Sequence, residues 1–176
     1  FMEHNLKEIG SLNKDLGQFD QIICLETIEH IIDDKQVVEQ LTRLLNPKGQ
    51  LLISVPYKGH RPVLGESSNP DYHSTVENGG HVRYGYTESE LRNLIDGCGL
   101  KVQQVGYLSG YLSQKMYNLW CRLDAVIPHS LTWVLTLPLR LLWLIDRPLS
   151  YLLKYPYLSL TIVATKQHPD KKSQVA

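Results

Sequence analysis

Three ionisable residues follow an apolar segment at a spacing that could build a cation site. Glu26, Glu29 and His30 stand directly after residues 19–25, which have the sequence FDQIICL. On a helical turn, positions 0, 3 and 4 lie on one side, so these side chains can converge. Two carboxylates held close together are costly unless a proton or a cation lies between them. A hard divalent ion would satisfy them, and His81 could supply a further nitrogen ligand.

Other interpretations of these residues stay open. Glu29 and His30 could merely cap the helix that follows or form salt bridges with it. If no metal binds, His30 or His81 could act as a general base. If a metal binds, two histidines and two carboxylates suit Mg²⁺, Mn²⁺, Zn²⁺ or Fe²⁺, so the residue types do not select the ion.

The elements that must position these residues form a predicted βαβ unit. Residues 19–25 are apolar and include β-branched side chains, which is typical of a strand buried on both faces. A helix is expected over 34–45, with Asp33 as its cap, and the turn at 46–49 ends it. Residues 50–57 repeat the pattern of a buried strand, so the two strands are expected to pair in parallel. Ligands of such sheets bind at the carboxyl ends of the strands, where the ionisable residues stand.

The chain after this unit combines a long loop with further regular elements. Residues 58–85 are rich in Gly, Pro, Asn and Ser and predict a loop that is either mobile or functional. Thr87-Glu88-Ser89-Glu90 has the form of a capping box and indicates the start of a helix. Strands are expected over 100–107 and 158–165.

A hydrophobic segment, residues 108–154, lies between those two strands. Its prolines at positions 128, 138 and 148 predict a series of short helices. Its longest uncharged run, 125–139, is shorter than the roughly 20 residues that a membrane span needs. We therefore expect a helical insertion that packs on the sheet and could serve as a lid over a substrate pocket. Peripheral membrane contact through residues 130–153 is the main alternative, and a true span is the least favoured.

Composition narrows the classes of function. The chain has 176 residues, enough for one domain with a core. Its 18 basic and 18 acidic residues leave no net charge, which argues against a nucleic-acid partner. Its 3 cysteines form no CxxC pair. This disfavours a disulfide scaffold or a thiolate zinc site and favours a reducing, cytoplasmic location.

Residues 19–31 and 44–56 together resemble class I S-adenosylmethionine-dependent methyltransferases. The family pattern is an FD-apolar strand followed by E-x-x-E-H, a helix ending R-x-L-x-P-G-G, and a strand ending S-x-P. The matching segments here are FDQIICLETIEHI and LLNPKGQLLISVP. Lys48 departs from the pattern, because the family usually has the first of two glycines there. Residues 81–87 (HVRYGYT) are also similar to the family's segment before its last crossover.

The resemblance implies a Rossmann-like α/β fold with seven strands in the order 3-2-1-4-5-7-6. Residues 1–6 would be the third strand, 19–25 the fourth and 51–56 the fifth. No G-x-G-x-G motif for the cofactor is found in the sequence. We therefore expect a sheet that is incomplete at its amino-terminal side, in a fragment of a longer enzyme that is inactive by itself.

The domain organisation implied by the resemblance is a core interrupted by the helical insertion before the last strand. The partial methyltransferase core would comprise 1–107 and 155–168, the insertion 108–154, and a disordered tail 169–176.

The resemblance also implies how S-adenosylmethionine would be bound. In the family, the residue that ends the third strand accepts a hydrogen bond from the adenine amino group, and Asn5 holds that place here. The Leu6 amide would donate to the adenine ring, and Leu25 would lie along the cofactor. These three residues are the expected cofactor contacts of the chain.

The E-x-x-E-H form is similar to that of two metal-assisted subgroups of the family. These are the ubiquinone-pathway O-methyltransferases and the small-RNA 3′-terminal 2′-O-methyltransferases. Carried over by position, Glu26, Glu29, His30 and His81 would hold Mg²⁺ or another divalent metal against the substrate hydroxyls. His30 and His81 would be the catalytic residues.

The expected function is transfer of a methyl group to the oxygen of a small-molecule, lipid-like or glycan acceptor. The leucine- and tryptophan-rich insertion would suit an apolar acceptor, whereas RNA fits poorly with the balanced charge. The alternative is a non-catalytic module, derived from the methyltransferase fold, that binds a membrane or a protein partner. The E-x-x-E-H motif argues against a third class, the nicotinamide-dependent Rossmann enzymes.

Overall fold

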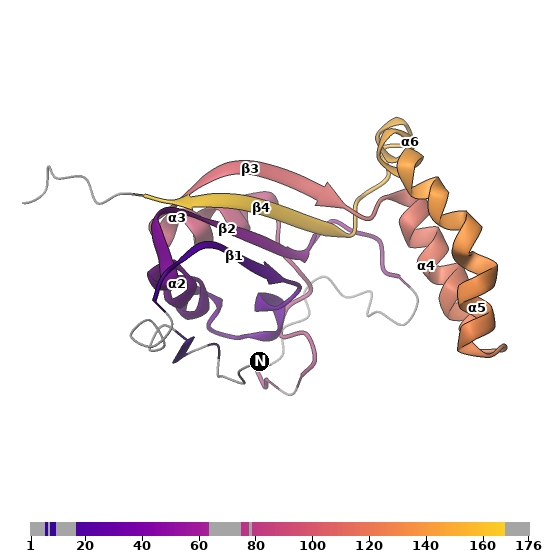
Figure 1. Cartoon of the computed structure of the whole chain (residues 1–176), viewed down its shortest axis with the longest axis horizontal. Coiled ribbons are helices and arrows are strands. Elements are labelled where there is room, and N and C mark those ends of the chain that lie inside the picture. The colour runs from indigo at the N-terminus through magenta and orange to yellow at the C-terminus, as the bar shows by residue number, and fades with distance from the viewer. Residues whose placement is uncertain (1–5, 7, 10–16, 64–74, 78, 168–176) are drawn as a thin grey trace, which may run out of the picture.

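The chain folds around a mixed four-stranded sheet whose strands follow the order β1-β2-β4-β3 (Figure 1). A computed structural model describes residues 6, 8–9, 17–63, 75–77 and 79–167. The strands are β1 (Phe19–Leu25), β2 (Leu45–Pro56), β3 (Leu100–Leu108) and β4 (Ser159–Lys166). β1 and β2 are parallel, and β4 is antiparallel to both of its neighbours. The α/β class and the parallel first pair are confirmed, and the order matches the 4-5-7-6 part of the expected sheet.

The predicted third strand falls almost wholly outside the described residues. Only its last residue, Leu6, is described, and its backbone is 3-10 helical rather than extended. Its side chain is partly buried and packs against the hydrophobic core. The predicted tail over 169–176 also lies outside the described residues.

The βαβ unit has the local chemistry that the sequence predicts. α2 (Asp34–Leu44) begins at its cap Asp33, whose carboxylate accepts a hydrogen bond from the Gln36 amide over 3.0 Å. β2 begins directly after α2, five residues earlier than expected, and its pairing with β1 is irregular near its start. Lys48 has a φ of 67° there, a left-handed conformation that favours glycine. The departure from the family pattern therefore carries a backbone cost at this turn.

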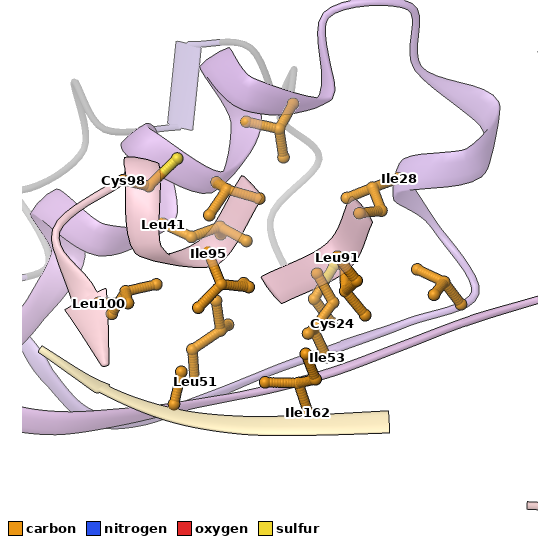
Figure 2. Close-up of a cluster of buried hydrophobic side chains, with 14 of the residues drawn as sticks. Cys24, Ile28, Leu41, Leu51, Ile53, Leu91, Ile95, Cys98, Leu100 and Ile162 are labelled. Atoms are coloured by element: carbon orange, nitrogen blue, oxygen red, sulfur yellow. The ribbon is translucent and has the colours of Figure 1, made fainter. Parts of the chain in front are cut away.

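Two helices cover one face of the sheet and form the core with it (Figure 2). α3 (Glu88–Gly97) is the second of them, and its Thr87–Glu90 capping box is present as predicted. The amide of Thr87 donates to Glu90 over 2.7 Å, and the amide of Glu90 donates back to Thr87 over 3.2 Å. Most of the largest fully buried side chains come from both helices and three strands: Val37, Val38, Leu45, Leu51, Ile53, Leu91, Ile95, Leu100, Leu160 and Ile162.

β1 is buried on only one of its faces, whereas the sequence predicts a strand that is buried on both. Cys24 is buried, but Ile23 is 63% exposed and Leu25 is 54% exposed. β1 lies at the edge of the sheet, and α2 and α3 lie on the same side of it. No described element covers the face to which Ile23 points. Among the described residues, the apolar side chains of β1 are therefore covered on one face of the sheet and uncovered on the other.

The insertion forms helices, as predicted, but it does not pack over the sheet. It contains α4 (Tyr111–Asp124), α5 (His129–Thr136), the 3-10 helix η3 (Leu137–Ile145) and α6 (Asp146–Leu152). These helices pack mainly on one another and project beyond the ends of β3 and β4 (Figure 1). Two of the predicted proline breaks are present, since α5 begins directly after Pro128 and η3 has Pro138 as its second residue, whereas Pro148 lies within the first turn of α6. The expectation of a unit packed on the sheet is wrong.

A buried carboxylate joins the first and last helices of the insertion. Asp146, at the start of α6, accepts hydrogen bonds from the Gly110 and Leu112 amides over 2.9 and 2.7 Å. It also accepts one from the Ser113 hydroxyl over 2.5 Å. The amide of Tyr111 donates to Ser150, which lies one turn after Asp146. α6 thus caps the amino-terminal end of α4 with its own side chains.

Length limits what the helices of this unit can do in a membrane. None of the helices in the described ranges combines the length and the apolarity required to cross a bilayer.

Candidate active site

The loop after β1 fixes Glu26 against β2. Glu26 has a φ of 44°, and its amide donates to the Ser54 carbonyl over 3.0 Å. Its carboxylate accepts a hydrogen bond from the Ser54 hydroxyl over 2.7 Å. Glu26 is therefore bound to β2 and does not join a metal-binding group, which corrects the expectation of a four-residue ligand set. The spacing argument assumed one helical turn from Glu26, but the 3-10 helix η2 (Ile28–His30) begins only after it.

The structure brings Glu29, His30 and His81 together. One potential ligand atom from each of these residues lies within 4.8 Å of the others. The rings of His30 and His81 meet edge to face, with their centroids 4.6 Å apart. His30 Nε2 lies 3.7 Å from Glu29 Oε1, which is too far for a hydrogen bond. Two elements contribute to the group, because His81 comes from the segment that follows β2.

Glu29 is a buried carboxyl group without a hydrogen bond among the described residues. Its exposed fraction is 0%, and neither of its side-chain oxygens has a partner there. The Nδ1 atom of His30 is buried and without a partner in the same sense. Buried polar atoms are nearly always paired in proteins, so such orphans call for an explanation. A proton or a bound cation would satisfy the carboxylate.

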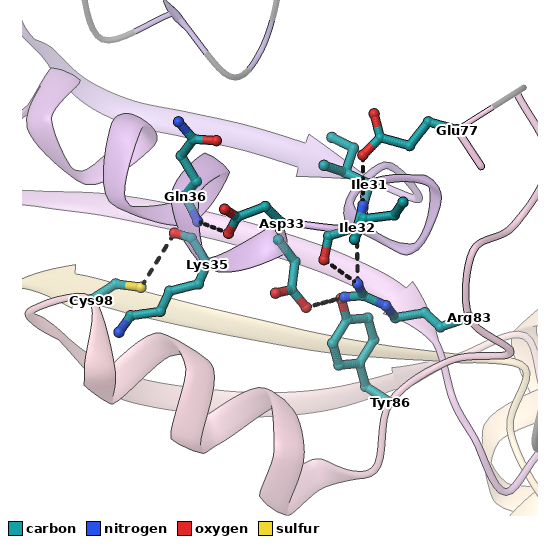
Figure 3. A network of polar contacts seen from close by, with 10 residues as sticks. Ile31, Ile32, Asp33, Lys35, Gln36, Glu77, Arg83, Tyr86 and Cys98 are labelled. Atoms are coloured by element: carbon teal, nitrogen blue, oxygen red, sulfur yellow. Dashed lines mark hydrogen bonds and ion pairs between the residues drawn. The ribbon is translucent and has the colours of Figure 1, made fainter. Parts of the chain in front are cut away.

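Arg83 positions the segment that carries His81 (Figure 3). One of its terminal nitrogens donates to the carbonyls of Ile31 and Ile32 over 2.8 and 2.9 Å. The other contacts the carboxylate of Asp34 and the hydroxyl of Tyr86. The hydroxyl of Tyr86 in turn donates to Asp34 over 2.6 Å. Arg83 thus ties the end of the loop to the residues between η2 and α2.

A backbone hydrogen bond completes this attachment. The amide of Val82 donates to the carbonyl of Glu29 over 2.9 Å, so His81 is held next to η2 by its own neighbour. Arg83 lies in the HVRYGYT segment but is not among the residues that the sequence predicts for the site. Burial and its hydrogen bond to Asp34 raise the pKa of the Tyr86 hydroxyl, so Tyr86 stays a donor. The network is a positioning device for the three-residue group.

Burial controls the ionisation of Glu29. Loss of solvent raises the pKa of its carboxyl group from 4.5 to about 7, and the nearby Glu26 carboxylate acts in the same direction. The backbone amide of Glu29 itself lowers the pKa, and the charge of Arg83 lowers it further, but burial outweighs both. Without a cation, Glu29 therefore keeps its proton to a higher pH than an exposed carboxyl group does. A cation must displace that proton, so we expect metal affinity to rise with pH.

This pKa predicts a pH-dependent stability of the metal-free protein. The folded state keeps a proton on Glu29 that the unfolded state releases above pH 4.5. The resulting stabilisation, ~3 kcal/mol when fully present, exists below pH 4.5 and is lost as pH rises through 7. Thermal unfolding of the wild type and of Glu29→Gln in EDTA, compared across this range, measures the effect. The difference between the two should change with pH, and parallel curves would contradict the buried carboxyl group.

The donor set fits a divalent cation. One carboxylate and two imidazoles form the ligand combination that Fe²⁺, Mn²⁺ and Zn²⁺ use in open sites. Mg²⁺ fits less well, because it prefers oxygen ligands and retained waters. The orphaned oxygens of Glu29 are the observation that favours a cation over an ordinary salt bridge.

The predicted cofactor contacts are only partly described. Asn5 lies outside the described residues. Leu6 lies against the core, and Leu25 is exposed at the carboxyl end of β1, next to the loop that leads to η2. Leu25 and the group of Glu29, His30 and His81 are thus at the same edge of the sheet, where α/β proteins bind their ligands.

Comparison with known proteins gives both sequence relatives and fold relatives. Ubiquinone biosynthesis O-methyltransferases from Pseudomonas paraeruginosa and Coxiella burnetii are 30% and 24% identical over 105 and 106 residues. These matches cover 58% and 59% of this chain but only 45% of each relative, so the chain spans less than half of their length. The fold resembles a protein from Galdieria sulphuraria assigned as a sarcosine dimethylglycine methyltransferase. That match has a TM-score of 0.51 at 14% identity and covers 93% of this chain and 58% of the other.

A family model described as a methyltransferase domain matches residues 2–105, more than half of the chain. The matched region contains the βαβ unit and all three residues of the candidate site. The chain belongs to the methyltransferase-domain family of class I S-adenosylmethionine-dependent enzymes.

Proposed function

We propose that this chain forms the acceptor-facing part of an S-adenosylmethionine-dependent O-methyltransferase. The observation that carries the proposal is the group of Glu29, His30 and His81 at the carboxyl edge of the sheet, with an orphaned buried carboxylate. Family membership supports methyl transfer, and the E-x-x-E-H loop supports an oxygen acceptor. The role of the whole protein is part of the proposal, because the chain spans only about half the length of the curated relatives that it matches.

S-adenosylmethionine would supply an activated methyl group on a sulfonium. Leu25 would line its binding site at the end of β1, with Asn5 and the Leu6 amide as contacts to the adenine. The described residues fit one wall of such a site, since Leu25 presents an exposed apolar side chain at that edge. A fragment with this wall alone is expected to bind the cofactor weakly.

The three-residue group would act on the acceptor hydroxyl. The acceptor oxygen forms a bond to the methyl carbon while the carbon–sulfur bond breaks and its electron pair stays on sulfur. If no cation is bound, the hydroxyl proton passes to His30 or His81, which then act as the general base. If a divalent cation is held by Glu29, His30 and His81, it would instead lower the pKa of the hydroxyl, whose proton would pass to water. The segment tied down by Arg83 keeps the acceptor oxygen and the base in a fixed arrangement.

The proposed acceptor is a small molecule of lipid-like or glycan type. Relatives named for ubiquinone biosynthesis support a small-molecule acceptor over a nucleic acid. The apolar helical insertion supports a hydrophobic one, and we include in the proposal a peripheral membrane contact through residues 130–153. The same exposed insertion favours the alternative function, a non-catalytic membrane- or partner-binding module.

Methyl transfer by the full-length gene product tests the proposal. We expect transfer from tritiated S-adenosylmethionine to a short-chain hydroxyquinone or catechol probe, and heat of binding with S-adenosylhomocysteine. His81→Ala should lower the transfer rate by ~10²–10⁴-fold, as loss of a general base does. His129→Ala, which changes an exposed histidine of the insertion, is the matched control. Absence of both heat and transfer would establish the non-catalytic alternative.

A further inference from the structure

In the helical insertion, the buried side chains are polar and the exposed ones are largely apolar, which is the reverse of the arrangement in the sheet and its two covering helices. Among residues 101–159, all of which the structure describes, no apolar side chain is buried. The sheet and its two covering helices show the opposite pattern, with Val, Leu and Ile inside. The buried side chains of the insertion and the following strand start are polar: Gln114, Thr132, Thr136, Asp146, Ser150 and Ser159.

The buried polar groups of the insertion have hydrogen-bond partners within the protein. Thr136 donates to the Thr132 carbonyl over 2.8 Å, and Gln114 donates to the carbonyls of Ser109 and Pro156 over 2.9 Å each. Asp146 is occupied by amides and a hydroxyl of α4. Small and polar residues that pack helices together while apolar residues face outward are typical of helices in lipid.

The outer surface of the insertion is strongly apolar. η3 has no buried residue, and its Leu141 and Leu144 are both 73% exposed. Trp143, between them, is 68% exposed. Soluble monomers rarely expose large apolar patches, and such patches mark interaction sites. The exposed apolar residues of the insertion lie on all its helical elements: Tyr117, Leu119, Leu131, Trp133, Val134, Leu135, Leu137, Leu141, Leu142, Trp143, Leu144, Ile145, Tyr151 and Leu152.

The spread of exposed apolar side chains over the whole insertion favours contact with a lipid bilayer over contact with a protein partner. A protein partner covers one face, whereas the exposed side chains here come from four successive elements. The tryptophans and leucines together suit the boundary between headgroups and acyl chains. Since no helix of the unit is long enough to span a bilayer, the insertion would lie in one leaflet.

Charge on the insertion specifies the kind of membrane. The chain has no net charge, but the insertion exposes five basic residues: Lys115, Arg122, Arg140, Arg147 and Lys154. The insertion has only two acidic residues, of which Asp146 is buried and Asp124 forms a hydrogen bond with His129 over 2.9 Å, so basic side chains predominate on its surface. The guanidinium of Arg140 lies over the ring of Trp133, 3.7 Å from its centroid. Cations among exposed aromatic and aliphatic side chains complement anionic headgroups.

We propose that the helical insertion docks the protein on anionic bilayers by inserting its apolar outer surface into one leaflet. The proposal rests on the membrane contact included in the proposed function and extends it to a defined surface and lipid charge. Lipid binding is independent of methyl transfer. A test without methyl donor therefore separates failure of this proposal from failure of the enzymatic one.

The tryptophans make the test direct, because all 3 of them (Trp120, Trp133 and Trp143) lie in the insertion. Vesicles made of equal parts of phosphatidylcholine and phosphatidylglycerol should shift the tryptophan fluorescence to the blue. In a flotation experiment, the protein should rise with these vesicles. Brominated lipids should quench the fluorescence. Pure phosphatidylcholine vesicles should bind the protein more weakly by about ten-fold or more, because the basic residues then find no anionic partner.

Two pairs of variants decide the outcome. Leu141→Ser with Leu144→Ser should reduce vesicle partitioning by at least about ten-fold. Ile23→Ser with Val76→Ser, which are 63% and 59% exposed in the sheet domain, should leave it unchanged. Arg147→Gln with Lys154→Gln should remove the preference for anionic vesicles. Unchanged partitioning of the leucine variant would overturn the proposal. So would a wild type that ignores vesicles and instead buries its tryptophans by dimerising, as light scattering would reveal.

Discussion

Glu29→Gln is expected to abolish stabilisation of the protein by Mn²⁺. Glu29 is the only carboxylate in the group with His30 and His81, and its two oxygens have no other described partner. A glutamine of the same shape can neither neutralise a cation nor lose a proton to it. For the wild type at pH 8, Mn²⁺ at 100 times its Kd should add about 2.7 kcal/mol to the free energy of unfolding. Thermal unfolding with and without Mn²⁺ measures this difference.

Glu26→Gln is the matched control for this experiment. It removes a carboxylate from the same loop, but one that accepts a hydrogen bond from Ser54 and stands outside the ligand group. The Mn²⁺ effect should survive in Glu26→Gln. His81→Ala should weaken Mn²⁺ binding by more than about 100-fold. Even substitution of a residue that only hydrogen-bonds to a metal ligand lowers metal affinity by roughly 10–100-fold. A loss in Glu26→Gln, or a wild type that Mn²⁺ does not stabilise, would remove the metal from the proposed function and leave His30 and His81 as bases.

Asp146→Ala is expected to unfold the base of the helical insertion. The substitution leaves the amides of Gly110 and Leu112 and the hydroxyl of Ser113 without their acceptor in a buried place. Each such orphan costs about 1–3 kcal/mol, so the loss of local stability should be about 3 kcal/mol or more. Amide hydrogen exchange of residues 111–124 and 146–152 measures it, while α2 and α3 provide an internal reference.

Asp124→Ala is the comparison for Asp146→Ala. Asp124 bonds to the exposed His129, and an exposed pair of this kind contributes less than about 1 kcal/mol. Protection of α4 should therefore stay close to that of the wild type in Asp124→Ala. If α4 exchanged its amide hydrogens at the same rate in both variants, packing between the helices, and not the hydrogen bonds of Asp146, would stabilise the unit.

Local patterns predicted the positioning elements well because their causes are local. The cap at Asp33 and the box at Thr87–Glu90 depend on residues three positions apart, and both are present. The position of His81 was predictable because parallel strands carry the residues after them to one edge of the sheet. The resemblance added the order of the strands, which no short segment encodes.

The rest depended on contacts between distant parts of the chain. Glu26 could not be excluded from the ligand set without knowing its positive φ and its bond to Ser54, 28 residues later. Arg83 reaches Asp34, 49 residues earlier, and nothing in its own neighbourhood marks it as the clamp of the site. Hydrophobicity alone could not tell a unit that packs on the sheet from one whose apolar side chains face outward.

The insertion leaves and rejoins the sheet at adjacent points. Leu108, at the end of β3, is the register partner of Ser159, at the start of β4. The amide of Leu158 also bonds to the carbonyls of Leu108 and Ser109. A tight hairpin turn could therefore bridge this junction without altering the strands. The segment could thus be exchanged, lengthened or deleted as a module while the pairing of β3 with β4 stays the same.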